Sequence, residues 1–240
     1  MSEPLVPRRV AVATVLSSIA GGWRTYRRCA MPALAFAAVF AALGVGIFVA
    51  LAHFGLAAMM LPFAGGFLLV GPAVLAGFFG LRRAVAAARR PGWGDVFAGF
   101  RRAPRGLWVL AGVCSLLLLI WLTDAATVYS FMIGAATPDV AQVARFHFWT
   151  SLMGAVLAFI VFNVTAFAVP LLFDGRAQLV TAVTASVRAV FANPGAMLAW
   201  GLILAVAIIA TILFPPLLLV SLPCLAFASD LLYLEVFPPA

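Results

Sequence analysis

Residues 32–54 read PALAFAAVFAALGVGIFVALAHF, an apolar run that contains no arginine, aspartate or glutamate. A helix needs about 20 apolar residues to cross the hydrocarbon core of a bilayer, so this run predicts a transmembrane helix. Five further runs of this kind follow, at residues 60–80, 106–133, 147–173, 197–214 and 216–237. The last two nearly touch, and Pro215 and Pro216 between them predict a tight hairpin because proline breaks helix continuity.

The composition supports the same class. Hydrophobic residues make up 66% of the 240 positions and charged residues 9%, whereas a soluble domain carries about 25% charged residues. We therefore expect an all-α integral membrane protein that forms one membrane domain over residues 1–240. A high pI from arginines scattered along membrane-flanking segments, with no recognisable nucleic-acid-binding module, does not indicate a nucleic-acid partner.

The arginines predict the orientation. Fourteen of the fifteen fall in polar segments that six spans place on one side of the membrane, and only Arg145 lies opposite. The positive-inside rule then puts both termini in the cytoplasm of a bacterial cell, with the chain in the inner membrane. Arginines beside a membrane attract anionic lipid headgroups. The predicted headgroup contacts are Arg24, Arg27, Arg28, Arg82, Arg83, Arg89, Arg90, Arg101, Arg102 and Arg105.

An amphipathic segment precedes each pair of spans. Apolar residues recur at helical spacing from Val12 to Tyr26, from Trp93 to Phe100 and from Leu179 to Phe191, which predicts three helices lying in the membrane interface. Six transmembrane helices are thus expected as three degenerate repeats, each an interfacial helix followed by a hairpin. The units cover residues 10–83, 93–174 and 177–237.

Three motifs resemble an uncharacterised bacterial family of six-span integral membrane proteins, domain of unknown function 2189. They are FLLVGP at residues 67–72, VPLLFD at 169–174 and SVRAVFANP at 186–194. The resemblance extends over nearly the whole chain. It implies six inner-membrane helices and no established activity.

Polar side chains inside the predicted spans are the candidates for chemistry, because such residues are costly in hydrocarbon and often line a pathway. At 1.5 Å per residue, Asn163 lies deep in its span, about 16 Å from Asp174. Asp230 falls near the inner interface, where water or an arginine can meet it. Asp124 falls near the outer one. An interhelical hydrogen bond is the simpler explanation of Asn163, and a substrate contact is the alternative.

No metal or cofactor is expected. His53 and His147 are the only histidines, and both fall near the outer boundary of the membrane. As a pair they are the available ligands for haem or a metal, but two interfacial histidines in contact with water are the simpler interpretation. Cys29, Cys114 and Cys224 have no paired spacing and are expected to be reduced, apolar packing residues.

Small residues at Ala38, Ala42, Gly46 and Ala50 form a stripe at helical spacing in the first span. Such stripes let helices approach closely, either inside the bundle or against another subunit. The chain contains no recognisable catalytic constellation, so we expect a non-catalytic scaffold or accessory subunit of a larger membrane complex. A small-solute or ion transporter, with its site between the repeats, is the alternative, and a haem-bearing subunit is a third hypothesis.

Overall fold

The computed structural model describes residues 5–134 and 139–239, with residues 66–70 and 73 described by their backbone alone. Every regular element in these ranges is helical, which confirms the all-α class for the described part of the chain. The elements are α1 (Val12–Arg28), α2 (Ala30–His53), η1 (Ala57–Met59), α3 (Met60–Ala86), α4 (Trp93–Arg102), α5 (Arg105–Met132), α6 (Val140–Thr165), α7 (Ala168–Phe173), α8 (Leu179–Ala192), α9 (Pro194–Leu213), η2 (Pro215–Leu217) and α10 (Leu218–Val236).

Five helical segments are long and apolar enough to cross a membrane. They are Ala30–His53, Arg105–Met132, Val140–Phe173, Pro194–Leu213 and Pro215–Val236. The predicted second span, residues 60–80, falls in α3, a continuous helix of 27 residues. The middle of that span includes 66–70 and 73, whose side chains lie outside the described residues. Five membrane-spanning candidates are therefore established, and the sixth span stays a prediction.

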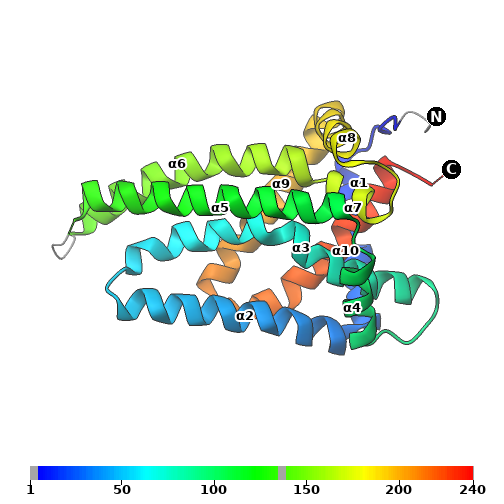
Figure 1. The fold of residues 1–240 in the computed structure, drawn as a ribbon, viewed down its shortest axis with the longest axis horizontal. Coiled ribbons are helices and arrows are strands. Elements are labelled where there is room, and N and C mark those ends of the chain that lie inside the picture. The colour runs from blue at the N-terminus through cyan, green and yellow to red at the C-terminus, as the bar shows by residue number, and fades with distance from the viewer. Residues whose placement is uncertain (1–4, 135–138, 240) are drawn as a thin grey trace.

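Helices α2, α3, α5 and α6 run roughly parallel, along the longest axis of the molecule, and α9 and α10 are inclined to them (Figure 1). The short helices α4 and α8 gather with α1 at the end where both chain termini lie, while the turn between α2 and α3 lies at the opposite end. Each predicted amphipathic segment is thus a helix. All three are at one end of the bundle.

Each of these three helices packs mainly against the second of the two long helices in a predicted hairpin. Helix α4 packs on α3, α8 on α6 and α7, and α1 on α10. The partner of α1 comes from the other end of the chain. The contact between α1 and α10 therefore joins the first and last parts of the sequence.

Glycines allow two of these close contacts. A Cβ atom added at Gly22 of α1 would overlap the backbone of α10 at Cys224, and one added at Gly99 of α4 would overlap the backbone of α3 at Ala76. Gly80 of α3 is equally constrained, because its added Cβ would overlap the carbonyl oxygen of Asp95. Helices α1 and α4 therefore rest directly on the backbones of α10 and α3. Apolar side chains on their other faces, such as Leu16 and Trp23, remain exposed.

The predicted fourth span, residues 147–173, is not one continuous helix. Helix α6 ends at Thr165 and α7 begins at Ala168. The hydroxyl of Ser186 on α8 donates to the carbonyl oxygen of Asn163 (2.8 Å) and accepts from the amide of Phe167 (3.1 Å). These two backbone groups would bond each other in an unbroken α-helix, so the inserted hydroxyl interrupts the ladder.

The second helices of the other two predicted hairpins contain a proline but are not interrupted by it. Pro72 lies inside α3 and Pro223 inside α10, and both helices continue through them. Between α9 and α10, the 3₁₀ turn Pro215–Leu217 separates two helices, which confirms the hairpin predicted from the paired prolines.

Candidate functional site

The best-connected polar site lies at the end of α3 that is nearest the chain termini. Arg82 donates from Nε to the carboxylate of Asp230 on α10, and Arg83 donates from Nη2 to the carboxylate of Asp174, which follows α7. Adjacent residues on a helix point about 100° apart. The two arginines can therefore reach carboxylates on α10 and directly after α7. Their ion pairs connect the second helices of all three predicted hairpins at one end of the bundle.

A second set of contacts surrounds these ion pairs. The guanidinium of Arg83 lies over the ring of Phe173, 4.3 Å from its centroid, and also donates to the Phe173 carbonyl oxygen. Arg176 donates from Nη1 to the hydroxyl of Tyr233 (3.0 Å) and to the carbonyl oxygen of Phe237 (2.6 Å). The loop after α7 is thereby bonded to the C-terminal end of α10. We call Arg82, Arg83, Asp174, Arg176, Asp230 and Tyr233 the inner network.

Burial makes the inner network electrostatically strong. The side chain of Asp230 is 3% exposed and that of Arg82 15%, while Arg83 and Asp174 are 32% and 20% exposed. Removing one partner of a buried pair leaves an uncompensated charge and costs about 3–5 kcal/mol. The network contains three arginines and two aspartates, so it neutralises both carboxylates internally.

The chain termini meet beside the inner network. The side chain of Asn193 accepts from the amide of Val10 (2.7 Å) and donates to the carbonyl oxygen of Arg8 (3.2 Å), while the amide of Arg8 donates to Val236 O (2.8 Å). Asn193 is buried. One asparagine at the start of α9 therefore holds the segment before α1, a role that its position before a proline does not reveal.

The three predicted intramembrane residues do not form one site. Asn163 is buried on α6 and donates to the carbonyl oxygen of Phe159 on its own helix (2.7 Å), not to another helix. Its Oδ1 is buried and has no hydrogen-bond partner among the described residues. Asp230 belongs to the inner network, and Asp124 is exposed on α5. Over residues 5–134 and 139–239, no hydrogen bond or ion pair joins any two of the three.

The two histidines have separate surroundings. His147 on α6 forms a hydrogen bond through Nε2 with the carbonyl oxygen of Ala58 in η1 (2.9 Å), which ties α6 to the turn of the first hairpin. His53 is exposed and packs its ring edge-on against Phe54. The part of the chain that the structure describes contains no group of three or more His, Cys, Asp or Glu side chains suited to hold a metal ion.

The cysteines are free and buried. Cys29 lies between α1 and α2 and shares a hydrophobic cluster with Cys224 and Tyr26. Burial raises the pKa of the Cys29 thiol to about 12, with a smaller contribution from Cys224. Burial also raises the pKa of Tyr26. The Cys29 thiol therefore stays protonated and unreactive at neutral pH.

The arginines predicted to meet lipid headgroups divide into two groups. Arg82 and Arg83 bind carboxylates inside the protein, and Arg89 pairs with Asp95 (2.9 Å) while remaining 56% exposed. The others are exposed and have no ion pair within the described ranges. They are Arg24, Arg27, Arg28, Arg90, Arg101, Arg102 and Arg105.

The small-residue stripe of α2 faces outward. Ala42, Gly46 and Ala50 are exposed and Ala38 is half-buried, and an added Cβ at Gly46 would meet no atom of the described residues within 4 Å. Gly154, by contrast, is a glycine that packs against another helix inside the protein. An added Cβ at Gly154 of α6 would lie 3.1 Å from the ring of Trp121, which is buried.

Long apolar helices that pack side by side, with their polar connections at the ends, define a multi-pass integral membrane protein. A family model described as a predicted integral membrane protein (DUF2189) matches residues 59–174. The family resemblance expected from the sequence motifs is thus confirmed over this segment, which contains both partners of the Arg83–Asp174 pair but not Asp230. No curated protein matches the chain. No solved structure matches it either.

Sequence reasoning found part of this site. It placed Asp230 where an arginine could meet it, but it did not identify Arg82 as the partner, and it did not predict the Arg83–Asp174 pair. Ser186, Asn193 and the close-contact glycines were missed. One available signal was the presence of glycine in the short amphipathic helices, where a residue with no side chain is costly unless a backbone approaches it.

Proposed function

We propose that this protein is a non-catalytic scaffold or accessory subunit of a larger complex in the bacterial inner membrane. The inner network is the observation that supports this most. Asp230 and Asp174, the carboxylates best placed to take part in transport, are neutralised by Arg82 and Arg83 of the same chain. Ion pairs that connect three helices favour an end of the bundle that is rigid over one that opens and closes during transport.

The outward-facing stripe on α2 supports an accessory role. Without a hydrophobic driving force between helices in lipid, small residues promote association because they let backbones come close. Ala42, Gly46 and Ala50 are exposed, and an added Cβ at Gly46 would meet no atom of the described residues within 4 Å. A transmembrane helix of a partner subunit is the occupant that the proposal assigns to this stripe.

The proposal includes six spans in three repeats, with both termini cytoplasmic. The similar packing of α4 on α3, α8 on α6 and α7, and α1 on α10 supports the repeats. The contact between α1 and α10 joins the first repeat to the last, so the three repeats close into a ring. The exposed arginines near α1 and α4 would then lie at the cytoplasmic surface, where anionic headgroups attract them.

Affinity purification from native membranes in gentle detergent, followed by mass spectrometry, tests the function. We expect a stoichiometric membrane partner that Gly46→Leu removes, because the new side chain blocks close helix approach. Gly201→Leu on α9 is the matched control, since its added Cβ is equally free of neighbours. Recovery of the chain alone, or equal partner recovery from the wild type and Gly46→Leu, would contradict the proposal.

A small-cation or solute carrier is the second candidate, and Asn163 is the observation that favours it. Its Oδ1 is buried and has no donor among the described residues, and Asn163 lies three residues from the break between α6 and α7. Broken helices with free oxygen atoms bind ions and substrates in many carriers. Loss of an uptake phenotype in Asn163→Ala at normal abundance would support the carrier, and reduced abundance alone would support a packing role.

A further inference from the structure

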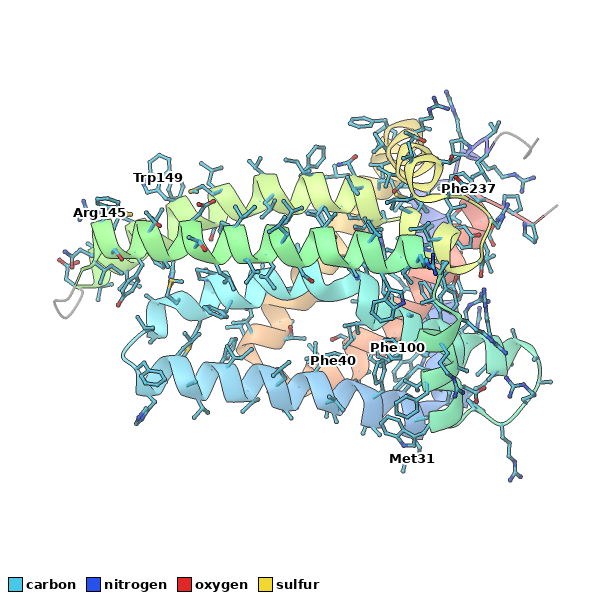
Figure 2. The ribbon with its side chains drawn as sticks, in the orientation of Figure 1. Met31, Phe40, Phe100, Arg145, Trp149 and Phe237 are labelled. Atoms are coloured by element: carbon cyan, nitrogen blue, oxygen red, sulfur yellow. The ribbon has the colours of Figure 1, made fainter. Side chains whose placement is uncertain are left out.

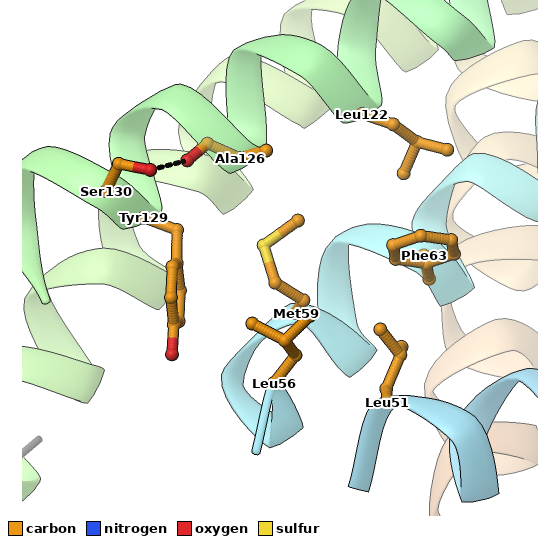
Figure 3. Close-up of a pocket in the computed structure, with 8 residues that line it drawn as sticks. All are labelled: Leu51, Leu56, Met59, Phe63, Leu122, Ala126, Tyr129 and Ser130. Atoms are coloured by element: carbon orange, nitrogen blue, oxygen red, sulfur yellow. Dashed lines mark hydrogen bonds between the residues drawn. The ribbon is translucent and has the colours of Figure 1, made fainter. Parts of the chain in front are cut away.

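A cavity of about 400 Å³ lies at the end of the bundle opposite the inner network. One wall comes from the turn of the first hairpin and includes Leu51, Met59 and Phe63; the other comes from α5 and includes Leu122, Ala126 and Tyr129 (Figure 3). Its volume is within the range of roughly 300–1,000 Å³ that is usual for ligand pockets. None of the functions considered above uses this cavity.

The walls favour a hydrocarbon occupant. Apart from two side chains of α5, every lining residue is apolar. The hydroxyl of Ser130 already donates to the carbonyl oxygen of Ala126 (3.0 Å). The hydroxyl of Tyr129 has no hydrogen-bond partner within the described part of the chain, and Figure 3 shows its ring along one side of the cavity. A ligand here therefore meets apolar side chains and a single available donor.

Depth in the membrane identifies the kind of ligand. Leu122 lies about 26 Å along α5 from Arg105 at the inner boundary, within a hydrocarbon core of about 30 Å. Tyr129 lies about 36 Å along the same helix, which is the depth of the polar interface. The cavity thus passes from hydrocarbon to the level where the ester groups of phospholipids lie. An acyl chain and its ester have this same order of apolar and polar parts.

We propose that this cavity holds one acyl chain of a phospholipid, whose ester carbonyl accepts a hydrogen bond from the Tyr129 hydroxyl. The chain lies against Met59, Phe63 and Leu122, and the headgroup stays outside at the interface. This site is separate from the predicted headgroup contacts of the arginines, because it recognises the chain and the ester and involves no arginine.

The test uses the full-length protein in nanodiscs of phosphatidylcholine that contain a fraction of lipid with a photoreactive diazirine in one acyl chain. After illumination, mass spectrometry maps the labelled residues. We expect label at Met59 and Leu122 well above that at Ala155, an exposed residue on the outer surface of α6. Equal labelling at the three positions would contradict the proposal.

Cavity-filling variants provide the decisive comparison. Ala126→Phe places a ring in the cavity and should abolish the excess label at Met59, whereas Ala155→Phe, a matched change on the surface of α6, should leave it unchanged. If Ala126→Phe does not fold, Leu122→Trp fills the same space from the preceding turn. Unchanged label at Met59 in the folded filling variant would overturn the proposal. Label that falls as the protein-to-lipid ratio rises would also overturn it, because a second protein copy would then cover the opening.

Tyr129→Phe tests the hydrogen bond by itself. The ring and the cavity wall remain, and only the donor is lost. Native mass spectrometry in detergent should show about fivefold weaker lipid retention, the factor expected for one neutral hydrogen bond. Retention equal to that of the wild type would rule out the assigned ester contact.

Discussion

Arg82 on α3 donates a hydrogen bond to the carboxylate of Asp230 on α10, across 148 positions of the sequence. Helix α3 belongs to the first predicted hairpin and α10 to the last. A single buried ion pair therefore links the first predicted hairpin to the last. Figure 2 shows the side chains along the bundle, with Phe237 at the end where the chain termini lie and Arg145 at the opposite end.

Arg82→Ala should lower the free energy of unfolding by about 3–5 kcal/mol, because the carboxylate of Asp230 is left buried without its counter-charge. Arg89→Ala is the matched control, since the Arg89 side chain is 56% exposed and an ion pair with a solvated arginine contributes about 0–1 kcal/mol. Titration with a denaturing detergent measures both. The double variant Arg82→Met with Asp230→Leu should recover most of the loss, and a loss equal to the sum of the single changes would argue against a direct pair.

Gly99→Ala should separate α4 from α3 and destabilise the protein by about 1–3 kcal/mol, because the added methyl group overlaps the backbone of Ala76. Gly94→Ala on the same helix has open space around its added Cβ and should change stability by less than about 0.5 kcal/mol. Thermal unfolding in detergent compares the two. Equal effects would show that helix propensity and not the close contact decides.

Ser186→Ala removes the hydroxyl that lies between Asn163 and Phe167. We expect a loss of about 1–3 kcal/mol, because both backbone groups are left without their present partner. Hydrogen exchange at the Phe167 amide should become faster, and Thr184→Ala, which changes an exposed hydroxyl of the same helix, should leave it unchanged. Slower exchange in Ser186→Ala would instead show that α6 and α7 join into one helix.

Cys29 should react slowly with maleimides in the folded protein, as measured in a variant with Cys114 and Cys224 replaced by alanine. Only the thiolate reacts, and burial, the larger cause of the rise in the pKa of the folded thiol to about 12, remains in this variant. Its rate should therefore rise about tenfold per pH unit up to that value, whereas the detergent-denatured chain should level off near pH 9. Because the folded pKa is the higher one, the stability that Cys29 contributes is complete below about pH 9 and is lost as the pH rises toward 12. A plateau near pH 9 in the folded protein would contradict this.

Features set by the local sequence were predictable, whereas features set by contacts between residues far apart in the chain were not. Five of the six apolar runs correspond to helical segments that are long enough to cross a membrane, and the Pro215–Leu217 turn and the three amphipathic helices also follow from local patterns. The start of the fourth run was the least accurate, because its helix begins at Val140 and not at residue 147. The interruption after Thr165 was not predicted as a break, since its cause is Ser186, more than 20 residues away. The direction of the Ala38–Ala50 stripe was also open, because small residues suit an internal and an external contact equally well.

The sequence by itself determined that this is a helical membrane protein, because each apolar run must satisfy its own backbone hydrogen bonds in hydrocarbon. Only the tertiary structure decided how its polar groups are used. It paired Arg82 with Asp230 and Arg83 with Asp174, buried the Asn163 oxygen with no donor in the described part of the chain, and opened a cavity beside Tyr129. These outcomes depend on which helices meet and at what rotation. Helical periodicity assigns a residue to a face of its own helix, but it does not say which helix that face will contact.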